Sequence, residues 1–542
     1  IYPVNPKHET IGDLHCYPTI KDIDHNVELA VLVIPANKVT EAMRQCADIG
    51  VKAAIILSAG FSEVGARGRT MQNKIVDIAR TNNISLVGPN CMGIIRPKTG
   101  LNASFSRSPV RQGRTALVAQ SGALCTSLLD WADSNGFGFS ACASLGAMAG
   151  VGFGDVLDYL AVDPHTESIM LCVEGVSNPR GFLSGLRVAA RLKPVIVIKT
   201  GRSGSGTRAS VAHFGSRVGS DQVFDAAIRR SGAVRVDSIS ELIAAARILV
   251  SGMRVEGPRL AVVTNGGGPG IMAADRAHDL QVPLAQLSSA TAKQLAKMLP
   301  KHWTHSVLVD VLAEAGPDEY GAATALTLAD EGVDGVLVLL TPQAATDAAA
   351  CADAVIASAA KSRKPVLSCW MGAALVEEGR ERFAKAGIPH FLSPEAGVEA
   401  FHHLARFRHN QKALLQAPGP LAAKDSPDVD GARLIIEHVL AERRKHLSHT
   451  EAKAVVRAFG IPISPSINVQ SAAEALVAAE SLGLPVAMKI SSPDIQQKTD
   501  VGGVRLNIRE PQTVRTAYRD LIDTVSQAVP DADILGVTIE PM

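Results

Sequence analysis

Short apolar runs recur along the chain, and amphipathic segments of helix length separate them. The runs with near-continuous hydrophobicity lie at residues 29–34, 53–57, 115–119, 169–173, 195–198, 260–263, 336–340 and 366–369. Because they lack the alternating polar positions of a half-exposed strand, both faces of each strand must be covered. The pattern therefore predicts βαβ units with parallel sheets, that is, a doubly wound α/β fold repeated along the chain.

Polar or Pro- and Gly-rich stretches divide this series into parts of domain size. The clearest linker lies at residues 417–428, where Pro and Gly interrupt any helix and few side chains are available for burial. After it, Ser448 and Glu451 form a capping box that predicts the start of a helix. The predicted parts are 1–105, 106–250 and 255–412, a linker at 413–445, and a last part at 446–542.

The composition indicates several packed domains and argues against two classes of partner. At ~100–200 residues per domain, 542 residues predict about three to five domains. Hydrophobic residues make up 46% of the chain and charged residues 20%, which is typical of a well-packed globular protein. A net charge of +1 gives no reason to expect nucleic acid or an anionic membrane as a partner. No apolar run approaches the ~20 residues of a membrane span.

The cysteines indicate the cellular compartment of the protein, and the first residues indicate whether the sequence is part of a longer chain. None of the eight cysteines has the CxxC spacing of a metal or redox site, and most lie beside apolar residues. We therefore expect buried, reduced thiols in a cytoplasmic protein. The chain begins at Ile1 rather than at Met and opens on what reads as the end of a strand. We expect it to be an internal part of a longer polypeptide.

The most informative motif is a histidine, His213, that follows a Gly- and Ser-rich stretch. A strand at residues 194–199 leads into what we expect to be a flexible loop, in which Gly215 and Gly219 leave room for a phosphoryl group. Imidazole suits covalent phosphoryl transfer because its neutral form is a nucleophile near pH 7. An isolated histidine in such a loop is more often a plain surface residue, so the interpretation depends on its neighbours.

Two further motifs are turns from a strand into a helix. Ser121 and Gly122 follow one apolar run, and Gly267 and Gly268 follow another, with Pro269 expected near the first position of its helix. Each turn leaves free backbone N–H groups and the positive end of a helix dipole, which favour a surface anion by ~0.3–1 kcal/mol. Taken singly, each is better explained as an ordinary tight turn of an α/β domain.

In this order, and together with the GPNCMG motif at residues 88–93, these motifs resemble the nucleoside-diphosphate-forming acyl-CoA synthetases, the family of succinyl-CoA synthetase. The resemblance covers essentially the whole chain. It implies a Rossmann-like CoA-binding domain at 1–105, flavodoxin-like domains at 106–250 and 255–412, and part of an ATP-grasp domain at 446–542. It also implies the reaction acyl-CoA + ADP + phosphate ⇌ carboxylate + CoA + ATP, by way of an acyl phosphate and a phosphohistidine.

The resemblance assigns roles to individual positions. His213 is the residue that is phosphorylated, and Glu174 is the carboxylate that hydrogen-bonds it. The positions implied for CoA are Pro35, Ser58, Gly60, Gly88, Pro89 and Asn90. Those implied for the phosphoryl group are Ser121, Gly122, Gly267 and Gly268. Those implied for the nucleotide are Lys489 and Lys498. The implied cofactors are CoA, ATP or ADP, and Mg²⁺, whose ligands we expect beyond Met542, so that none of the site residues is a metal ligand. We expect acyl-CoA and nucleotide as small-molecule partners, and a homo-oligomer.

Two alternatives remain open from the sequence. The same body occurs in bacterial protein lysine acetyltransferases, where it is regulatory, binds acetyl-CoA and would act on protein substrates; the runs at 101–105 and 407–411 resemble those proteins. Phe214 and the stretch at 306–310 depart from the synthetase pattern, which leaves a catalytically inactive CoA or nucleotide sensor as the second alternative. His213 favours the synthetase. If the synthetase interpretation holds, the two glycine-initiated helix starts should converge near His213, with Lys489 in a separate nucleotide site.

Overall fold

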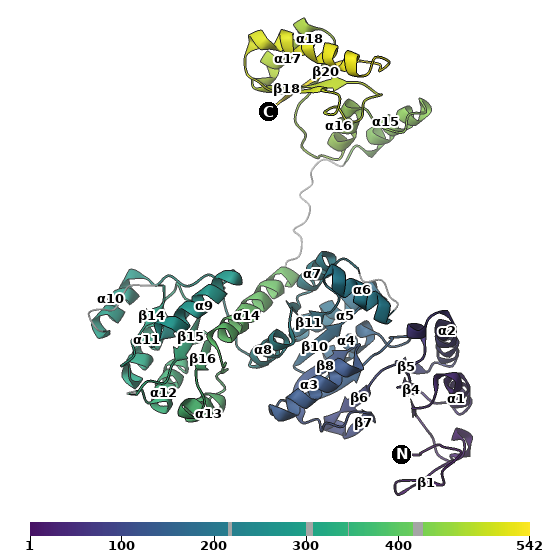
Figure 1. Ribbon diagram of the computed structural model, residues 1–542, viewed down its shortest axis with the longest axis vertical. Coiled ribbons are helices and arrows are strands. Elements are labelled where there is room, and N and C mark those ends of the chain that lie inside the picture. Colours follow the sequence, from purple (N-terminus) through teal and green to yellow (C-terminus); the bar gives the residue numbers. More distant parts are fainter. Residues whose placement is uncertain (215–218, 300–306, 345, 416–426) are drawn as a thin grey trace. The chain divides into compact units, whose positions relative to one another are not determined.

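A computed structural model describes residues 1–214, 219–299, 307–344, 346–415 and 427–542, apart from the side chains of residues 210–214. The chain forms two compact units, Ile1–Gln416 and Ala417–Met542. Figure 1 shows both units and labels many of their helices and strands. Sheets covered by helices make up each unit, as the hydrophobic pattern predicts.

The first sheet of unit 1 is parallel and has the order β3-β4-β5. Its strands are β3 (Leu29–Leu32), β4 (Ala53–Ile56) and β5 (Ser85–Val87), and its helices are α1 (Ala36–Asp48) and α2 (Ala66–Thr81). Val39 and Met43 of α1 and Ile75 of α2 are fully buried, because they form the apolar stripe that each helix presents to its core. A small hairpin of β1 (Thr10–Ile11) and β2 (Leu14–His15) precedes this sheet.

The second sheet has seven strands in the order β12-β11-β10-β8-β9-β6-β7. They are β6 (Gly93–Arg96), β7 (Leu101–Ser104), β8 (Gln112–Ala119), β9 (Phe139–Ser144), β10 (Ser168–Val173), β11 (Val195–Lys199) and β12 (Val234–Val236). β8 to β12 are parallel, whereas the edge strands β6 and β7 are antiparallel to their neighbours. The parallel part has the flavodoxin-like order 2-1-3-4-5, with its switch point between β8 and β10.

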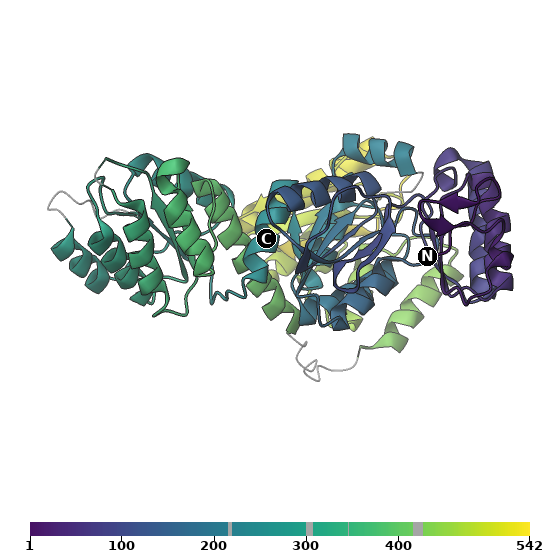
Figure 2. The same cartoon turned by 90° about the horizontal axis from the view of Figure 1, so that it is seen from below.

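Helices cover both faces of this sheet, as Figure 2 shows. They are α3 (Gly122–Ser134), α4 (Phe153–Val162), α5 (Pro179–Leu192), α6 (Gly204–Phe214), α7 (Asp221–Arg230) and α8 (Ile239–Val250). Every residue of β10 is buried. Coverage of both faces explains why its sequence is apolar without alternation.

The third sheet is parallel and repeats the same connectivity, with the order β14-β13-β15-β16. Its strands are β13 (Leu260–Thr264), β14 (Val309–Asp310), β15 (Gly335–Leu340) and β16 (Val366–Trp370). Its helices are α9 (Gly267–Asp279), α10 (Ser289–Met298), α11 (Pro317–Ala329), α12 (Ala348–Ala359), α13 (Glu377–Lys385) and α14 (Pro394–Leu415). The long helix α14 packs against α8 and α9, so the second and third sheets share one hydrophobic core.

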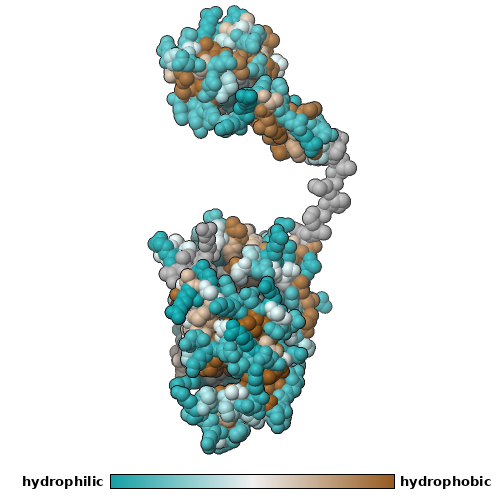
Figure 3. All heavy atoms as spheres, turned by 90° about the vertical axis from the view of Figure 1, so that its right-hand side faces the viewer, coloured by the Kyte–Doolittle hydropathy of each residue, from teal (hydrophilic) through white to brown (hydrophobic). Residues whose placement is uncertain are grey.

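Unit 2 is a four-stranded antiparallel sheet with the order β17-β20-β18-β19. Its strands are β17 (Ile467–Val469), β18 (Val486–Ser491), β19 (Val504–Ile508) and β20 (Gly536–Pro541). Its helices are α15 (Val429–Ala441), α16 (His449–Ala458), α17 (Ala472–Leu482) and α18 (Pro511–Ala528). Leu434 and Leu440 of α15 and Phe459, which follows α16, are exposed, and Figure 3 shows hydrophobic residues gathered on this part of the unit.

These observations confirm the predicted fold class and the predicted strands. The capping box is also confirmed, because Ser448 Oγ accepts a hydrogen bond from Glu451 N and the Glu451 carboxylate accepts one from Ser448 N. All eight cysteines are free and buried, as expected. Among the residues that the structure describes, no helix is both long and apolar enough to cross a bilayer.

The predicted domain limits stay predictions. The hairpin of β6 and β7 precedes the limit at residue 105, yet it pairs with β9 of the second sheet. Helix α15 lies within the predicted linker 413–445. Most of the Pro- and Gly-rich stretch that suggested this linker, up to residue 426, falls outside the described residues.

Candidate active site

The carboxyl ends of β8 and β10 lie side by side at the switch point of the seven-stranded sheet. Ser121 follows β8 and caps α3, because its Oγ accepts a hydrogen bond from Leu124 N at 3.2 Å. Glu174 follows β10. Ligands of doubly wound folds bind at such a switch point. The strand order thus brings Ser121, Gly122 and Glu174 to one edge of the sheet.

Gln120 ties the two strand ends together. Its side-chain Oε1 accepts hydrogen bonds from Glu174 N at 2.6 Å and from Gly175 N at 2.9 Å. Its own backbone N donates to Cys172 O at 3.2 Å. These bonds fix the main chain at Glu174 relative to the start of α3. Sequence reasoning missed Gln120, because only the strand order shows that it faces a residue 54 positions away.

The Glu174 carboxyl group is buried and incompletely bonded. The residue is 7% exposed, and its Oε2 has no hydrogen-bond partner among the residues that the structure describes. Burial raises the pKa of Glu174 to about 7. A carboxyl group that titrates near neutral pH and keeps a free oxygen is suited to orient a neighbouring imidazole.

The segment around His213 is helical, which corrects the expectation of a flexible loop. Ser203 starts α6, since its Oγ accepts a hydrogen bond from Gly206 N at 3.1 Å and its carbonyl accepts one from Thr207 N at 2.7 Å. Good helix formers after the Gly- and Ser-rich stretch then outweigh its loop-like composition. The side chain of His213 lies outside the described part, so its contact with Glu174 stays a prediction.

The third sheet repeats the arrangement at its own switch point. Asn265 follows β13, and its Oδ1 accepts hydrogen bonds from Thr341 N and Oγ1 at 2.8 and 3.0 Å. Thr341 follows β15, the neighbouring strand. An amide side chain therefore ties two strand ends together just before a helix begins, as Gln120 does in the second sheet.

Gly267 and Gly268 form the first two positions of α9. Among the residues that the structure describes, a Cβ on Gly268 would meet no atom within 4 Å, and one on Gly267 would approach Asp310 Oδ2 at 4.0 Å. The described residues thus leave room for a side-chain carbon at this helix start. Pro269 stands at the third helical position rather than the first, so the helix begins earlier than expected. The convergence of this helix start with that of α3 near His213 stays a prediction.

The residues expected to contact CoA gather at the carboxyl ends of β3, β4 and β5. Ser58 Oγ donates to Ile34 O at 2.5 Å, and Ser58 O accepts a hydrogen bond from Asn90 N at 3.0 Å. Gly60 has φ +108°, and a Cβ there would come within 3.0 Å of Ala36 Cβ, beside Pro35. The three loops are therefore joined directly.

The turn that contains Gly88 and Pro89 also borders the second sheet. Gly88 has φ +94°, and a Cβ there would lie 2.5 Å from Ile56 O, so only glycine fits. Pro89 O accepts a hydrogen bond from Ala147 N at 2.9 Å. A Cβ on Gly122 would lie 3.3 Å from Met92 N of the same turn. The expected CoA loops and the start of α3 are thus neighbours.

In unit 2, Lys489 belongs to a cluster around one buried carboxylate. Glu540 of β20 is 6% exposed. Its Oε2 accepts a hydrogen bond from Lys489 Nζ at 2.5 Å, and its Oε1 accepts one from Lys453 Nζ at 2.6 Å. The ring of His449 lies 2.7 Å from the same Oε1. Sequence reasoning missed Lys453, His449 and the role of Glu540, because these partners are 87 and 91 positions apart.

The charged groups of this cluster shift the pKa values of Glu540 and Lys498. Burial alone would raise the pKa of Glu540, but hydrogen bonds from Lys453, Lys489 and His449 outweigh it and lower the pKa to about 2. Burial and the charge of Lys489 lower the pKa of Lys498, whose carbonyl accepts a hydrogen bond from Gly503 N at 2.7 Å. Lys489 and Lys498 thus lie close enough to interact, and both carry charge that a nucleotide phosphate would neutralise.

Within the described residues, no group of three or more His, Cys, Asp or Glu side chains could hold a metal ion. Mg²⁺ usually keeps several waters and binds through one or two carboxylates together with the phosphates of a nucleotide, so the expectation that its ligands lie beyond Met542 stays a prediction.

Three family models match successive parts of the chain. A CoA-binding domain matches residues 1–97, a succinyl-CoA ligase-like flavodoxin domain matches residues 112–249, and an ATP-grasp domain matches residues 438–542. Their order agrees with the order that the sequence motifs imply.

Individual relatives match over the whole chain. It is 37% identical over 546 residues to ADP-forming acetate–CoA ligase I of Archaeoglobus fulgidus, with 100% of this chain and 77% of the relative covered. It is 32% identical to an ADP-forming 4-hydroxybutyrate–CoA ligase of Nitrosopumilus maritimus, with 100% and 78% covered. The relatives reported are named as ligases, which supports the synthetase interpretation and gives no support to the acetyltransferase alternative.

A solved structure agrees with these matches. Acetyl-coenzyme A synthetase 1 of Candidatus Korarchaeum cryptofilum, in complex with phosphate and ADP, superposes with a TM-score of 0.70 at 29% identity. The match covers 77% of this chain and 91% of that one.

Proposed function

The chain belongs to the nucleoside-diphosphate-forming acyl-CoA synthetases, and we propose that its acyl substrate is a short carboxylate, with acetate as the first candidate. As a member of this family it interconverts acyl-CoA, ADP and phosphate with a carboxylate, CoA and ATP. The name of the Archaeoglobus relative supports acetate. The 4-hydroxybutyrate relative, at 32% identity, indicates that the acyl group varies within the family.

The reaction divides into three transfers. Phosphate attacks the thioester carbonyl of acyl-CoA, which expels the CoA thiolate and forms an acyl phosphate. A ring nitrogen of His213 then takes the phosphoryl group and releases the carboxylate. The terminal oxygen of ADP takes it from the histidine, which forms ATP and frees the imidazole for the next cycle.

Glu174 carries the proposal for the second transfer. Its buried carboxyl group, with an oxygen that no described residue bonds, lies at the switch point where a phosphoryl group would bind. We assign it the role of holding the proton on the imidazole nitrogen that does not react, which fixes the tautomer and stabilises the ring as the phosphoryl group leaves. Gln120 fixes the position of Glu174, because its side-chain oxygen accepts hydrogen bonds from the main-chain N–H groups of Glu174 and Gly175.

The start of α3 supplies the anion site for this step. Ser121 and Gly122 leave backbone N–H groups at the positive end of the helix dipole. The 88–93 turn, which contains Gly88, Pro89 and Asn90, approaches Gly122 through Met92. A thioester held by the CoA loops would therefore lie beside the phosphate bound at this helix start. We assign the start of α9, with Gly267 and Gly268, to the same phosphoryl group.

Unit 2 holds the nucleotide in this proposal. Lys489 and Lys498 are the candidate phosphate contacts, and Glu540 keeps Lys489 and Lys453 in place until the nucleotide binds. We assign no step to Mg²⁺, whose ligands we expect beyond Met542. The phosphoryl group must travel between this site and Glu174, since in-line transfer needs close contact at each site. A homo-oligomeric state and a cytoplasmic location stay predictions.

Phosphorylation of His213 tests the proposal. The complete protein, given radiolabelled ATP and Mg²⁺, should take up an acid-labile, base-stable label. His213→Ala should abolish it, and added carboxylate with CoA should discharge the parent label. Equal labelling of parent and variant would show that another residue carries the phosphoryl group.

A further inference from the structure

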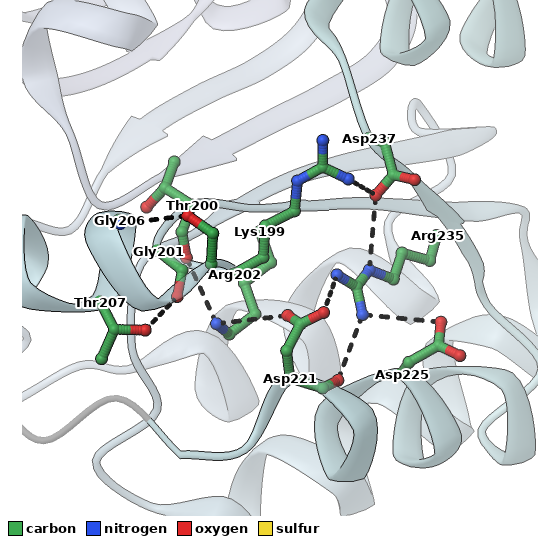
Figure 4. A network of polar contacts seen from close by, with 11 residues as sticks. Lys199, Thr200, Gly201, Arg202, Gly206, Thr207, Asp221, Asp225, Arg235 and Asp237 are labelled. Atoms are coloured by element: carbon green, nitrogen blue, oxygen red, sulfur yellow. Dashed lines mark hydrogen bonds and ion pairs between the residues drawn. The ribbon is translucent and has the colours of Figure 1, made fainter.

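Both ends of the segment that carries His213 meet at one ion-pair cluster (Figure 4). This segment, residues 200–220, leaves β11 after Lys199 and enters α7 at Asp221. Asp221 Oδ1 lies 3.6 Å from Lys199 Nζ, and Asp221 Oδ2 lies 2.7 Å from Arg235 Nη2. The segment thus begins after Lys199 and ends before Asp221, and the side chains of these two residues contact each other.

The two cations reach Asp221 from neighbouring parallel strands. Arg235 pairs with Val197 in the register of β11 and β12. Lys199 stands two residues beyond Val197, so it lies on the same face of the sheet as Arg235. The Lys199 and Arg235 side chains are only 4% and 7% exposed, whereas that of Asp221 is 30% exposed. Cations buried to this degree require a negative partner, and Asp221 is shared by both.

Three further contacts hold the start of α7 in place. Arg235 Nη1 donates to the main-chain carbonyl of Asp221 at 3.3 Å. The ring of Phe224, on the next turn of α7, has its centroid 5.5 Å from Lys199 Nζ and 5.8 Å from Arg235 Cζ. Both cations lie within the range of attraction to an aromatic face. Side chain, main chain and ring thus bind the end of the segment to the sheet.

An outer pair, by contrast, contributes little. Arg202 Nη1 lies 2.7 Å from Asp237 Oδ1, and their side chains are 49% and 54% exposed. Solvent-exposed pairs of this kind contribute little, because water screens them and their side chains lose entropy. The buried contacts of Asp221 are therefore the ones that hold the two ends together.

We propose that Lys199, Asp221 and Arg235, named the clamp from here on, are positioning residues that set the place of His213 for phosphoryl transfer. In this proposal the clamp acts through the two ends of the segment. This inference rests on the proposed role of His213. Since transfer needs close in-line geometry, a loosened clamp should lower the rate of transfer more than the affinity for any ligand.

The first test compares Asp221→Asn with Asp225→Asn in the complete protein. Asp225 lies one turn later on α7, 3.6 Å from Arg235 and 2.8 Å from Arg229, but it is not an end of the segment. Hydrogen exchange of the α6 amides is the readout, and it does not depend on activity. We expect D221N to accelerate exchange ~10-fold or more and D225N to leave it close to the parent. Equal exchange in D221N and the parent would overturn the clamp.

The second test follows the rate of His213 labelling in a single turnover. We expect D221N to lower this labelling rate ~10–100-fold, while KM for ATP and for CoA, measured at steady state, stays within about twofold. Asp221→Glu and Lys199→Arg, which keep the charges, should recover much of the rate. A purely structural role would instead change KM, CoA binding and melting temperature together.

The charges of the clamp provide a third test. In D221N the buried cations Lys199 and Arg235 lose their shared carboxylate. Adding Lys199→Met to D221N removes one unpaired cation, so the double variant should be less impaired than the product of the two single effects. If the double variant is instead impaired by the product of the two single effects, Lys199 and Arg235 do not share the Asp221 carboxylate.

The outcomes also separate this inference from the proposed function. If the parent protein takes up no label at His213, the proposed function fails, and the exchange experiment still decides whether the clamp holds the segment. If the parent is labelled and D221N is labelled equally fast, the proposed function stands and the clamp does not position His213.

Discussion

Replacing Glu174 by glutamine should stabilise the protein at alkaline pH while it impairs phosphoryl transfer. Burial raises the pKa of Glu174 from 4.5 to about 7. Between these values the folded chain holds a proton that the unfolded chain has lost, so the free energy of unfolding falls as the pH rises from 4.5 to 7 and stays lower above it. At ~1.4 kcal/mol per pH unit, ionisation of this buried carboxyl costs ~3 kcal/mol of stability at pH 8.

Glutamine has nearly the same shape and no charge, so E174Q avoids this cost. Its amide N–H groups need partners of their own, which leaves a net gain of ~1–2 kcal/mol at pH 8. For a domain of ~150–250 residues, this corresponds to a melting temperature higher by ~3–6 °C. At pH 5 the gain should be absent, because the parent carboxyl is then neutral as well.

Calorimetric melting of the complete protein at pH 5 and pH 8 measures this difference. Glu167 is a matched control, since it stands at the opposite end of the same strand, 37% exposed and paired with Arg114. Glu167→Gln should show no gain at pH 8. In the same preparations E174Q should label His213 at least ~10-fold more slowly than the parent. An E174Q that melts below the parent at pH 8 would show an ionised, paired carboxylate and would refute the reasoning.

Three further predictions concern the other parts of the site. Gly268→Ala should leave the melting temperature unchanged, because its Cβ meets no atom of the described residues within 4 Å, but should slow His213 labelling; equal labelling in calorimetrically matched samples would remove α9 from the site. Glu540→Gln should weaken ATP binding by ~10-fold in titration calorimetry, since Lys489 and Lys453 lose the carboxylate that orients them, while CoA binding stays unchanged. Gly88→Ala should weaken CoA binding and lower stability by ~1–3 kcal/mol, because its Cβ would lie 2.5 Å from Ile56 O; an unchanged CoA titration would place the ligand elsewhere.

The sequence predicts the strands and the edge of the sheet at which the site lies, because both depend on local pattern. A continuous apolar run must be buried on both faces, and parallel strands bring their carboxyl ends to one edge. Ser121 and Glu174 therefore follow from their positions after two such runs. What the sequence lacks is strand order, and hence the contacts that cross it.

The residues that sequence reasoning missed all act across large separations. Gln120 reaches residues 174 and 175 because β8 and β10 are neighbours, and Lys453 of α16 reaches Glu540 of β20 across 87 positions. No periodicity marks such contacts. The helix at His213 was missed for the opposite reason, since its Gly- and Ser-rich approach favours a loop, whereas Ser203 caps a helix there.

The two flavodoxin-like sheets share one hydrogen-bond arrangement, which indicates how each positions its ligands. In both, an amide side chain directly before a helix bonds the end of the strand across the switch point: Gln120 to the main chain at Glu174, and Asn265 to the main chain at Thr341. The hydrogen bonds hold the two strand ends in the same way in both sheets, but the residue held differs. In the second sheet it is Glu174, with a titratable carboxyl group, and in the third it is Thr341, with a neutral hydroxyl group. Only the carboxyl group can hold the proton of an imidazole and stabilise its positive charge. This difference supports our proposal that the phosphohistidine step takes place at the second sheet, while the glycine-initiated helix start of the third sheet helps to bind the anion.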